Sequence, residues 1–286
     1  MRYMRLLAYS LGVLLLVGCA GIKFTYNNLD WIVPWYLEDL ITLNKEQNDL
    51  FEQEFESLWR WHRQHELPKY ISALESLKKD IAEDTLSMQK ITDYREQSTT
   101  LYRTVAKQAI SQSLALMATL DEDQIAEINS LIEDEAVEFE EYMAETSAEQ
   151  RVKKTIRRTE KQSRKWLGKL TKKQKRLIAE WGNGVESTTE YRYDYFKRSR
   201  KEFLEAISYR QDQQELAKRL YFLVDERDSL HTKAHIETRE RNAQRVSNLM
   251  LELHASLTKK QKRRLLSKLS NYQESFTELA AEVESE

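Results

Sequence analysis

Apolar residues recur every three or four positions along most of this chain, which is the spacing of one face of an α-helix. The spacing predicts a helix at residues 44–83, bent or broken at Pro68, and six further helices. Those six span residues 87–118, 121–145, 147–169, 171–209, 212–256 and 258–284, and the last has the clearest stripe, made of Leu265, Leu269, Tyr272, Phe276, Leu279 and Val283. We therefore expect an all-α protein, built as an elongated bundle of about seven long amphipathic helices.

Glycine and proline are rare. The 286 residues include 6 Gly and 2 Pro, too few for the frequent turns of a β-sandwich, a β-barrel or a βαβ fold. The nucleotide-binding patterns GxGxxG and GxxxxGK[ST] do not occur in the sequence. A content of 41% hydrophobic and 32% charged residues argues against both a polytopic membrane protein and a wholly disordered chain.

One short motif occurs four times: a leucine, a helix-capping residue, and a glutamine three positions after the capping residue. In such a capping box the capping side chain accepts a hydrogen bond from the glutamine backbone, and the glutamine side chain accepts one from the capping backbone. Each copy therefore predicts the start of a helix. The residues of the four boxes are Asn44 and Gln47, Asp121 and Gln124, Thr171 and Gln174, and Thr258 and Gln261.

The spacing of these motifs predicts an internal repeat. The first two leucines lie 77 positions apart and the last two lie 87 apart. We expect a first three-helix unit at residues 44–146 and a second at 170–286. A basic helix at residues 147–169 is expected to connect them.

Charge reverses sharply at this connection. Residues 121–149 include twelve acidic and no basic side chains, whereas residues 151–176 include thirteen basic side chains and one acidic side chain. The pattern favours an antiparallel hairpin about Ser147, with Phe139 facing Ile156, over one continuous helix. In that hairpin the basic helix neutralises the acidic one through many weak ion pairs; the alternative is that it binds nucleic acid or anionic lipid.

The first 18 residues have the composition of a secretory signal peptide. Two arginines precede an apolar run at residues 6–17, which is too short to span a bilayer. The run ends in Leu16-Val17-Gly18-Cys19, which resembles the bacterial lipobox, whose cysteine is acylated before the signal is removed. Cys19, the only cysteine of the chain, is therefore the expected lipid attachment site; the alternative is an ordinary buried thiol.

The expected address is the periplasmic face of the outer membrane. In lipoproteins of this kind an Asp after the cysteine typically retains the protein in the inner membrane, and here Ala20 follows. Removing residues 1–18 leaves 43 basic and 47 acidic side chains, a balance that gives no reason to expect binding to nucleic acid.

Aromatic residues gather in the segment at residues 19–43, which follows the signal peptide. They are Phe24, Tyr26, Trp31, Trp35 and Tyr36. Amphipathic rings favour the headgroup layer of a membrane, so the segment is expected to be a membrane-proximal foot, unless its rings pack against the bundle.

Further along the chain, the candidate partner surface consists of Trp59, Trp61, His62, Tyr191 and Tyr193. For His62 the alternative is a partly buried, hydrogen-bonded histidine. Tyr191, Tyr193 and Tyr195 cannot all share one helix face, so some of them should be exposed.

The sequence gives no pattern for catalysis, a metal site or a cofactor. His231 and His235 have the i,i+4 spacing that can place two imidazoles on one face, but zinc or iron sites need three or four ligands. Neither HExxH nor GxSxG is present, and the carboxylates are too numerous to single out a catalytic pair. We therefore expect a protein that is not an enzyme.

The four motifs resemble those of the LTxxQ periplasmic proteins of the Spy and CpxP kind, which are small helical chaperones or sensors. Thr171 and Thr258 match that pattern fully, whereas Asn44 and Asp121 replace its threonine. A likeness over most of the chain, to a group of uncharacterised proteobacterial lipoproteins, rests on two stretches. They are Tyr26, Asn27, Asp30, Trp31, Trp35 and Tyr36, and then Trp61, His62, Arg63, Glu66, Leu67 and Pro68.

Two functions are compatible with these observations. The favoured one is a lipid-anchored scaffold or adaptor that binds one folded protein of the envelope. The alternative is a chaperone-like surface that binds unfolded periplasmic or outer-membrane proteins, as the LTxxQ resemblance implies.

Overall fold

The structure, a computed structural model, describes residues 19–38 and 40–282, and these residues form helices and no strand. The prediction of an all-α protein is confirmed. The predicted signal peptide at residues 1–18 and Val283 lie outside the described residues.

The first half of the chain begins with two short helices, which longer helices follow. Its elements are α2 (Cys19–Asn27), α3 (Leu29–Glu38), α4 (Lys45–Trp61), a π-helix η1 (His62–Glu66), α5 (Leu67–Ala82), α6 (Met88–Ala118) and α7 (Glu122–Glu145). Pro68 has no backbone N–H to donate, and the chain widens into the π-helix directly before it, so the expected helix at residues 44–83 is interrupted there.

The second half contains more helices than the spacing predicted. Its elements are α8 (Ala148–Leu167), α9 (Lys172–Gly184), α10 (Thr189–Ser208), α11 (Gln213–Asp225), a 3₁₀-helix η2 (Arg227–Leu230), α12 (Lys233–Ala255) and α13 (Lys259–Ala281). The expected helix at 171–209 ends at Gly184, because glycine is a poor helix former. The expected helix at 212–256 is divided as well, because Thr232 caps a separate helix α12 by accepting a hydrogen bond from the His235 backbone.

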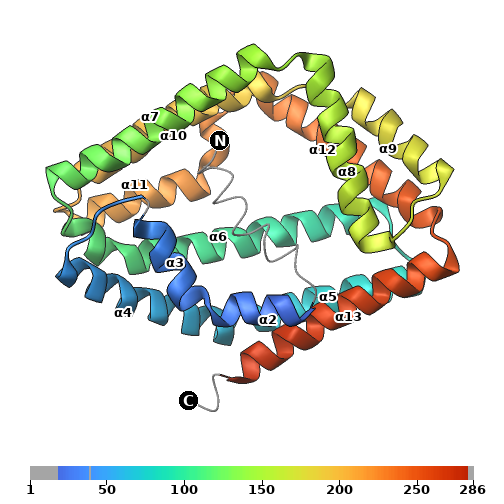
Figure 1. Ribbon diagram of the computed structural model, residues 1–286, viewed down its shortest axis with the longest axis horizontal. Helices are drawn as coiled ribbons and strands as arrows, with labels where there is room; N and C mark the ends of the chain where they lie inside the picture. The colour runs from blue at the N-terminus through green and yellow to red at the C-terminus, as the bar shows by residue number, and fades with distance from the viewer. Residues whose placement is uncertain (1–18, 39, 283–286) are drawn as a thin grey trace.

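The helices form the sides of an open polygon and not one elongated bundle (Figure 1). Three sides consist of paired helices: α13 lies along α5, α11 along α6, and α10 along α7. Each pair joins a helix of the expected first unit to a helix of the expected second unit. Packing between these sequence-distant segments therefore closes the frame.

The first two motifs meet at one end of this frame. Gln47 and Gln124 are buried, and each side-chain amide donates to the other side-chain carbonyl, at 3.0 and 2.7 Å. Each amide also donates to the backbone carbonyl two positions before the partner's capping residue, namely Thr119 and Thr42. Each glutamine carbonyl closes its own capping box as well, so the two side chains satisfy one another.

The last two motifs repeat this arrangement at the other end. Gln174 and Gln261 exchange side-chain hydrogen bonds of 3.0 and 2.9 Å. Their amides donate to the carbonyls of Ser256 and Lys169, which again lie two positions before the partner's capping residue. The four capping boxes predicted from the sequence are confirmed, and the structure adds that they interlock as two pairs.

The expected hairpin between the acidic and basic helices is wrong. Ser147 does start α8 with a capping box, but α8 turns a corner away from α7 (Figure 1). Phe139 stacks on Tyr193 of α10, with ring centroids 5.3 Å apart, and Ile156 packs in a cluster with α9. The contact with α9 is close: a Cβ on Gly182 would lie 2.3 Å from Ile156 Cγ1, so only a glycine at this position permits the observed approach of α8 and α9.

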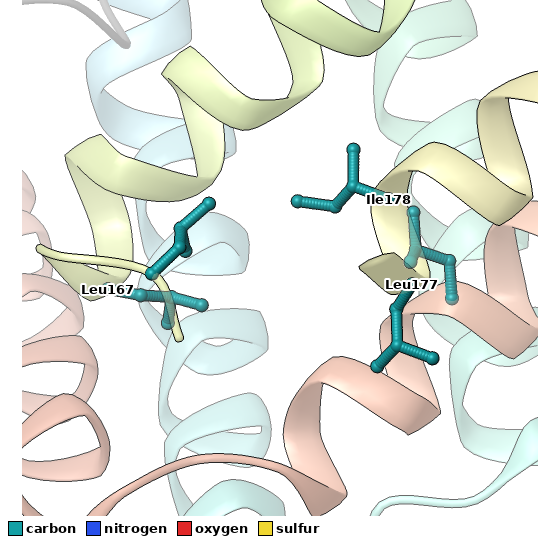
Figure 2. Close-up of a cluster of buried hydrophobic side chains, with 5 residues drawn as sticks. Leu167, Leu177 and Ile178 are labelled. Carbon is teal, nitrogen blue, oxygen red and sulfur yellow. The ribbon is translucent and has the colours of Figure 1, made fainter. Parts of the chain in front are cut away.

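Figure 2 shows the core between α8 and α9, to which Leu167 at the end of α8 and Leu177 and Ile178 of α9 belong. The cluster also contains Leu170 and Leu249, so it joins α8 and α9 to α12. Fully burying a leucine or isoleucine side chain stabilises the fold by about 1.5–3 kcal/mol. This cluster therefore holds the second motif pair in place.

The paired glutamines give a stability prediction. Gln174→Ala should lower the free energy of unfolding by about 1–3 kcal/mol more than Gln150→Ala, because it removes both hydrogen bonds between Gln174 and Gln261 and leaves one buried N–H of the Gln261 amide without a partner. Gln150 is a matched control, since it closes a capping box at Ser147 but is exposed and has no partner glutamine. Chemical denaturation of the single and double variants measures the coupling between Gln174 and Gln261, expected at about 0.5–3 kcal/mol. A coupling near zero would contradict the interlocked pair.

Candidate functional site

The first described helix, α2, docks on the frame through the π-helix. Tyr26, buried in α2, donates to or accepts from His62 Nδ1 at 2.7 Å, and His62 Nε2 lies 3.2 Å from the Tyr70 hydroxyl. Tyr26 also packs with Leu67 of α5 and Leu279 of α13. Helix α2 is thereby fixed to two helices of the frame.

A buried arginine reinforces this junction. The Arg63 guanidinium lies over the Trp59 ring, 4.1 Å from its centroid, and donates to Asn27 Oδ1 at 2.7 Å. Glu66 is fully buried one turn further on and accepts a hydrogen bond from Lys69 at 2.6 Å. Widening of the helix at η1 places Arg63 and Glu66 in the interior.

Trp59 and His62 therefore do not form the partner surface that was expected of them. They lie under α2 and α13, where burial lowers the pKa of His62 to about 4. The alternative prediction, a partly buried and hydrogen-bonded histidine, is confirmed. Trp61 remains half-buried, with its ring 6.1 Å from that of His65.

In the segment after Cys19, called here the foot, some of the aromatic residues are exposed. Cys19 is the first residue of α2. Phe24, Trp31 and Trp35 on α2 and α3 are 64%, 55% and 54% exposed, whereas Tyr26 is buried. Tyr26 thus packs against the frame, and the other three rings are presented to the surroundings.

A second group of residues forms a cleft, called here the His-pair cleft, between α7, α10, η2 and α12. Its volume is about 360 Å³. The rings of Tyr191 and Tyr195 stack on those of His235 and His231, with centroid distances of 5.2 and 4.2 Å. Both pairs have i,i+4 spacing, so two short segments of opposite direction match ring for ring.

The two histidines are buried, at 9% and 3% exposure, and lie edge to face 4.3 Å apart. Both ring nitrogens of His231 and Nδ1 of His235 have no hydrogen-bond partner. Burial, followed by the charges of nearby groups such as Arg239, lowers the pKa of His231 to about 4 and lowers that of His235. The pair is therefore neutral at pH 7.

Tyr191 and Tyr193, the other expected surface residues, are half-buried because α10 is covered on two sides. Tyr191 faces α12 through His235, and Tyr193 stacks on Phe139 of α7 and bonds to Glu140. Tyr195 is half-buried too, so the expectation that some of the three tyrosines are exposed is wrong. The arginines that line the cleft were missed, since Arg192, Arg227 and Arg239 converge only in the folded chain.

The basic helix α8 is not neutralised by the acidic helix α7. Cations for α7 come from α10 and the turn after it, where Arg200 bonds to Asn129 and Glu133, and Arg210 pairs with Glu122. Together α8 and the start of α9 present what is called here the basic surface. It consists of exposed Lys153, Lys154, Arg157, Arg158, Lys161, Arg164, Lys172, Lys173, Lys175 and Arg176.

Two kinds of feature are absent from the described residues. Between Cys19 and Glu282, Asp39 excepted, no three His, Cys, Asp or Glu residues gather as metal ligands. In the same part of the chain no helix is long and apolar enough to cross a membrane.

Comparison with known proteins gives one match. Residues 39–236 match the model of a family of unknown function, DUF6279. No curated protein and no solved structure matches the chain. A relation to the LTxxQ proteins is therefore not shown, and the matched region ends before the fourth motif at Thr258.

The buried state of His62 gives a pH prediction. Its pKa in the folded chain, about 4, lies below the ordinary value of 6.5, so the unfolded chain binds the proton first. The stabilisation by neutral His62 is full above pH 6.5 and is lost as the pH falls toward 4. In denaturant unfolding between pH 7 and 4, His62→Gln should show a shallower decline than the wild type, with the remainder due in part to His231. The control His65→Gln, at an exposed site, should keep the wild-type slope; equal slopes for both variants would contradict the prediction.

Proposed function

We propose that this chain, which belongs to the DUF6279 family of unknown function, is a lipid-anchored, non-enzymatic scaffold of the bacterial envelope that docks an acidic protein partner on its basic surface. The observation that carries the proposal is that surface, which no acidic helix covers among the described residues. The expected site of action is the periplasmic face of the outer membrane, with Cys19 as the lipid attachment site.

The ion pairs of the basic surface are local and few. Lys153 pairs with Glu149, Arg164 with Glu160, and Arg176 with Glu180, each within its own helix. Exposed pairs of this kind contribute about 0–1 kcal/mol. Within the described chain, no carboxylate lies in ion-pair distance of Arg157, Arg158, Lys161 or the lysines of α9. These side chains are available to an acidic partner.

Helix electrostatics supply a second argument. The first turn of α9 contains Lys172 and Lys173, although positive charge is unfavourable at the positive end of the helix dipole. The corresponding turn of α7, in the other motif pair, contains Glu122 and Asp123, which are favourable there. The lysines of α9 thus bring no local stability, which is consistent with a role in binding.

The foot supports membrane anchoring. Exposed Phe24, Trp31 and Trp35 lie within 16 positions of Cys19, and amphipathic rings favour the headgroup layer. Because α2 is packed on α13, a lipid on Cys19 would hold the whole frame at the membrane surface.

A chaperone for unfolded chains is less well supported. Such a protein needs a continuous apolar surface, and an exposed patch of that kind normally marks an interaction site. Outside the foot, the large exposed hydrophobic side chains of the described residues lie on different elements. They are Tyr102, Val137, Tyr209, Phe222 and Met250.

Site-specific crosslinking in the cell tests the proposal. A photo-crosslinking amino acid at Lys154 should give one discrete band, and replacing Arg157, Arg158 and Lys161 by Glu should reduce that band at least tenfold. A matched control replaces the exposed lysines Lys45, Lys201 and Lys233 by Glu, which changes the net charge equally and should leave the band unchanged.

Three outcomes would contradict the proposed function. A smear of many proteins would favour the chaperone, and an unchanged band in the charge-reversed variant would exclude the basic surface. Retention of the non-acylated Cys19→Ser chain on anionic vesicles, lost after charge reversal, would assign the basic surface to lipid instead of protein.

A further inference from the structure

We propose that the His-pair cleft is a binding site for an aromatic carboxylic acid, that is, a ligand with a carboxylate and an aromatic ring. This site is separate from the basic surface, since it is built from α7, α10, η2 and α12 and not from α8 and α9. The proposal goes beyond the scaffold function and does not depend on it.

The unpartnered imidazole nitrogens are the first observation. A buried polar atom without a hydrogen-bond partner costs about 1–3 kcal/mol. Here three such atoms occur in two neighbouring side chains, His231 and His235, and both side chains line the cleft. A neutral imidazole offers one N–H donor and one acceptor. A polar ligand that displaces a side chain covering these nitrogens would supply the partners that the protein does not.

The charge of the lining is the second observation. Arg192, Arg227 and Arg239 all border the cleft, against one carboxylate, that of Glu135. Arg239 is bound to Asp228 at 2.8 Å, but in the described part of the chain no carboxylate lies in ion-pair distance of Arg192 or Arg227. A guanidinium offers paired donors that match a carboxylate. The ligand is therefore an anion, and the same arginines disfavour a metal cation.

The walls of the cleft specify the rest of the ligand. Phe139, Tyr193, Tyr195 and Phe196 supply flat apolar surfaces, and the Arg227 guanidinium lies over the Tyr195 ring at 5.3 Å. A volume of about 360 Å³ falls at the lower end of small-molecule sites, which span about 300–1,000 Å³. One aromatic acid fits this size. Its carboxylate would lie between the arginines and the histidines, with its ring among the aromatic walls.

Two sources could supply this chemistry: a free aromatic acid, or the carboxyl end of a polypeptide that finishes in an aromatic residue. The probes are N-acetyl-phenylalanine, its neutral amide as a matched control, inorganic phosphate, and the tripeptide Gly-Gly-Phe. Titration calorimetry uses the full chain in detergent micelles.

N-acetyl-phenylalanine should bind, and the amide should bind at least tenfold more weakly. Arg192→Gln and Arg227→Gln, both at exposed positions and so compatible with folding, should each weaken the acid at least tenfold. Arg241→Gln is the control, because Arg241 lies on α12, one of the helices that line the cleft, but binds Glu186 outside the cleft. It should leave the affinity unchanged, as should the charge reversal in α8.

Equal binding of acid and amide, no binding of the acid, or an unchanged affinity in both cleft variants would overturn the proposal. If phosphate binds as tightly as the acid, the claim that the ligand has an aromatic ring is overturned. If the tripeptide binds more tightly than the acetylated amino acid, the site takes a polypeptide end, and if it binds more weakly the site takes a free acid; both results support the carboxylate.

Discussion

A buried carboxamide has two donors and two acceptor positions, and all of them need partners once water is excluded. In this protein that requirement is met only when two helix starts meet face to face, as with Gln47 and Gln124. Gln174 and Gln261 repeat the solution. Each pair joins segments 77 or 87 positions apart, and the two pairs lie at opposite ends of the long axis (Figure 1). The course of the intervening helices, and hence the open frame, depends on these two contacts.

The surfaces proposed for function follow from this frame. Because α8 turns away from α7 at Ser147 and packs on α9, its basic side chains remain uncovered. Because α10 lies between α7 and α12, aromatic and imidazole rings meet beside arginines in one cleft. Because α2 packs on α13 and α3 packs on α4, the segment with Trp31 and Trp35 belongs to the frame. The aromatic segment after Cys19, the basic surface and the His-pair cleft thus occupy different parts of one frame.

Local chemistry was predictable from the sequence, and long-range pairing was not. A capping box involves four consecutive residues, so the starts of α4, α7, α9 and α13 followed from the motif. The box at Ser147 has the same local chemistry, yet Gln150 has no partner glutamine, and nothing in the motif separates the two cases. The apolar stripe of α8 suited a hairpin with α7 equally well, and its periodicity did not show that α8 packs on α9, where Gly182 permits a close approach to Ile156. The cleft draws on four elements, so its arginines could not be grouped in advance.

Native-state hydrogen exchange of the helix starts tests most directly whether interlocked glutamines hold the frame. First-turn N–H groups normally exchange quickly, because helix ends fray. If the glutamine pairs hold the frame, the backbone N–H groups of Gln47, Gln124, Gln174 and Gln261 exchange as slowly as those in the middle of their helices. The N–H of Gln150, in a box without a partner, should exchange much faster. Exchange at the four paired glutamines as fast as at Gln150 would contradict the conclusion that the glutamine pairs hold the frame.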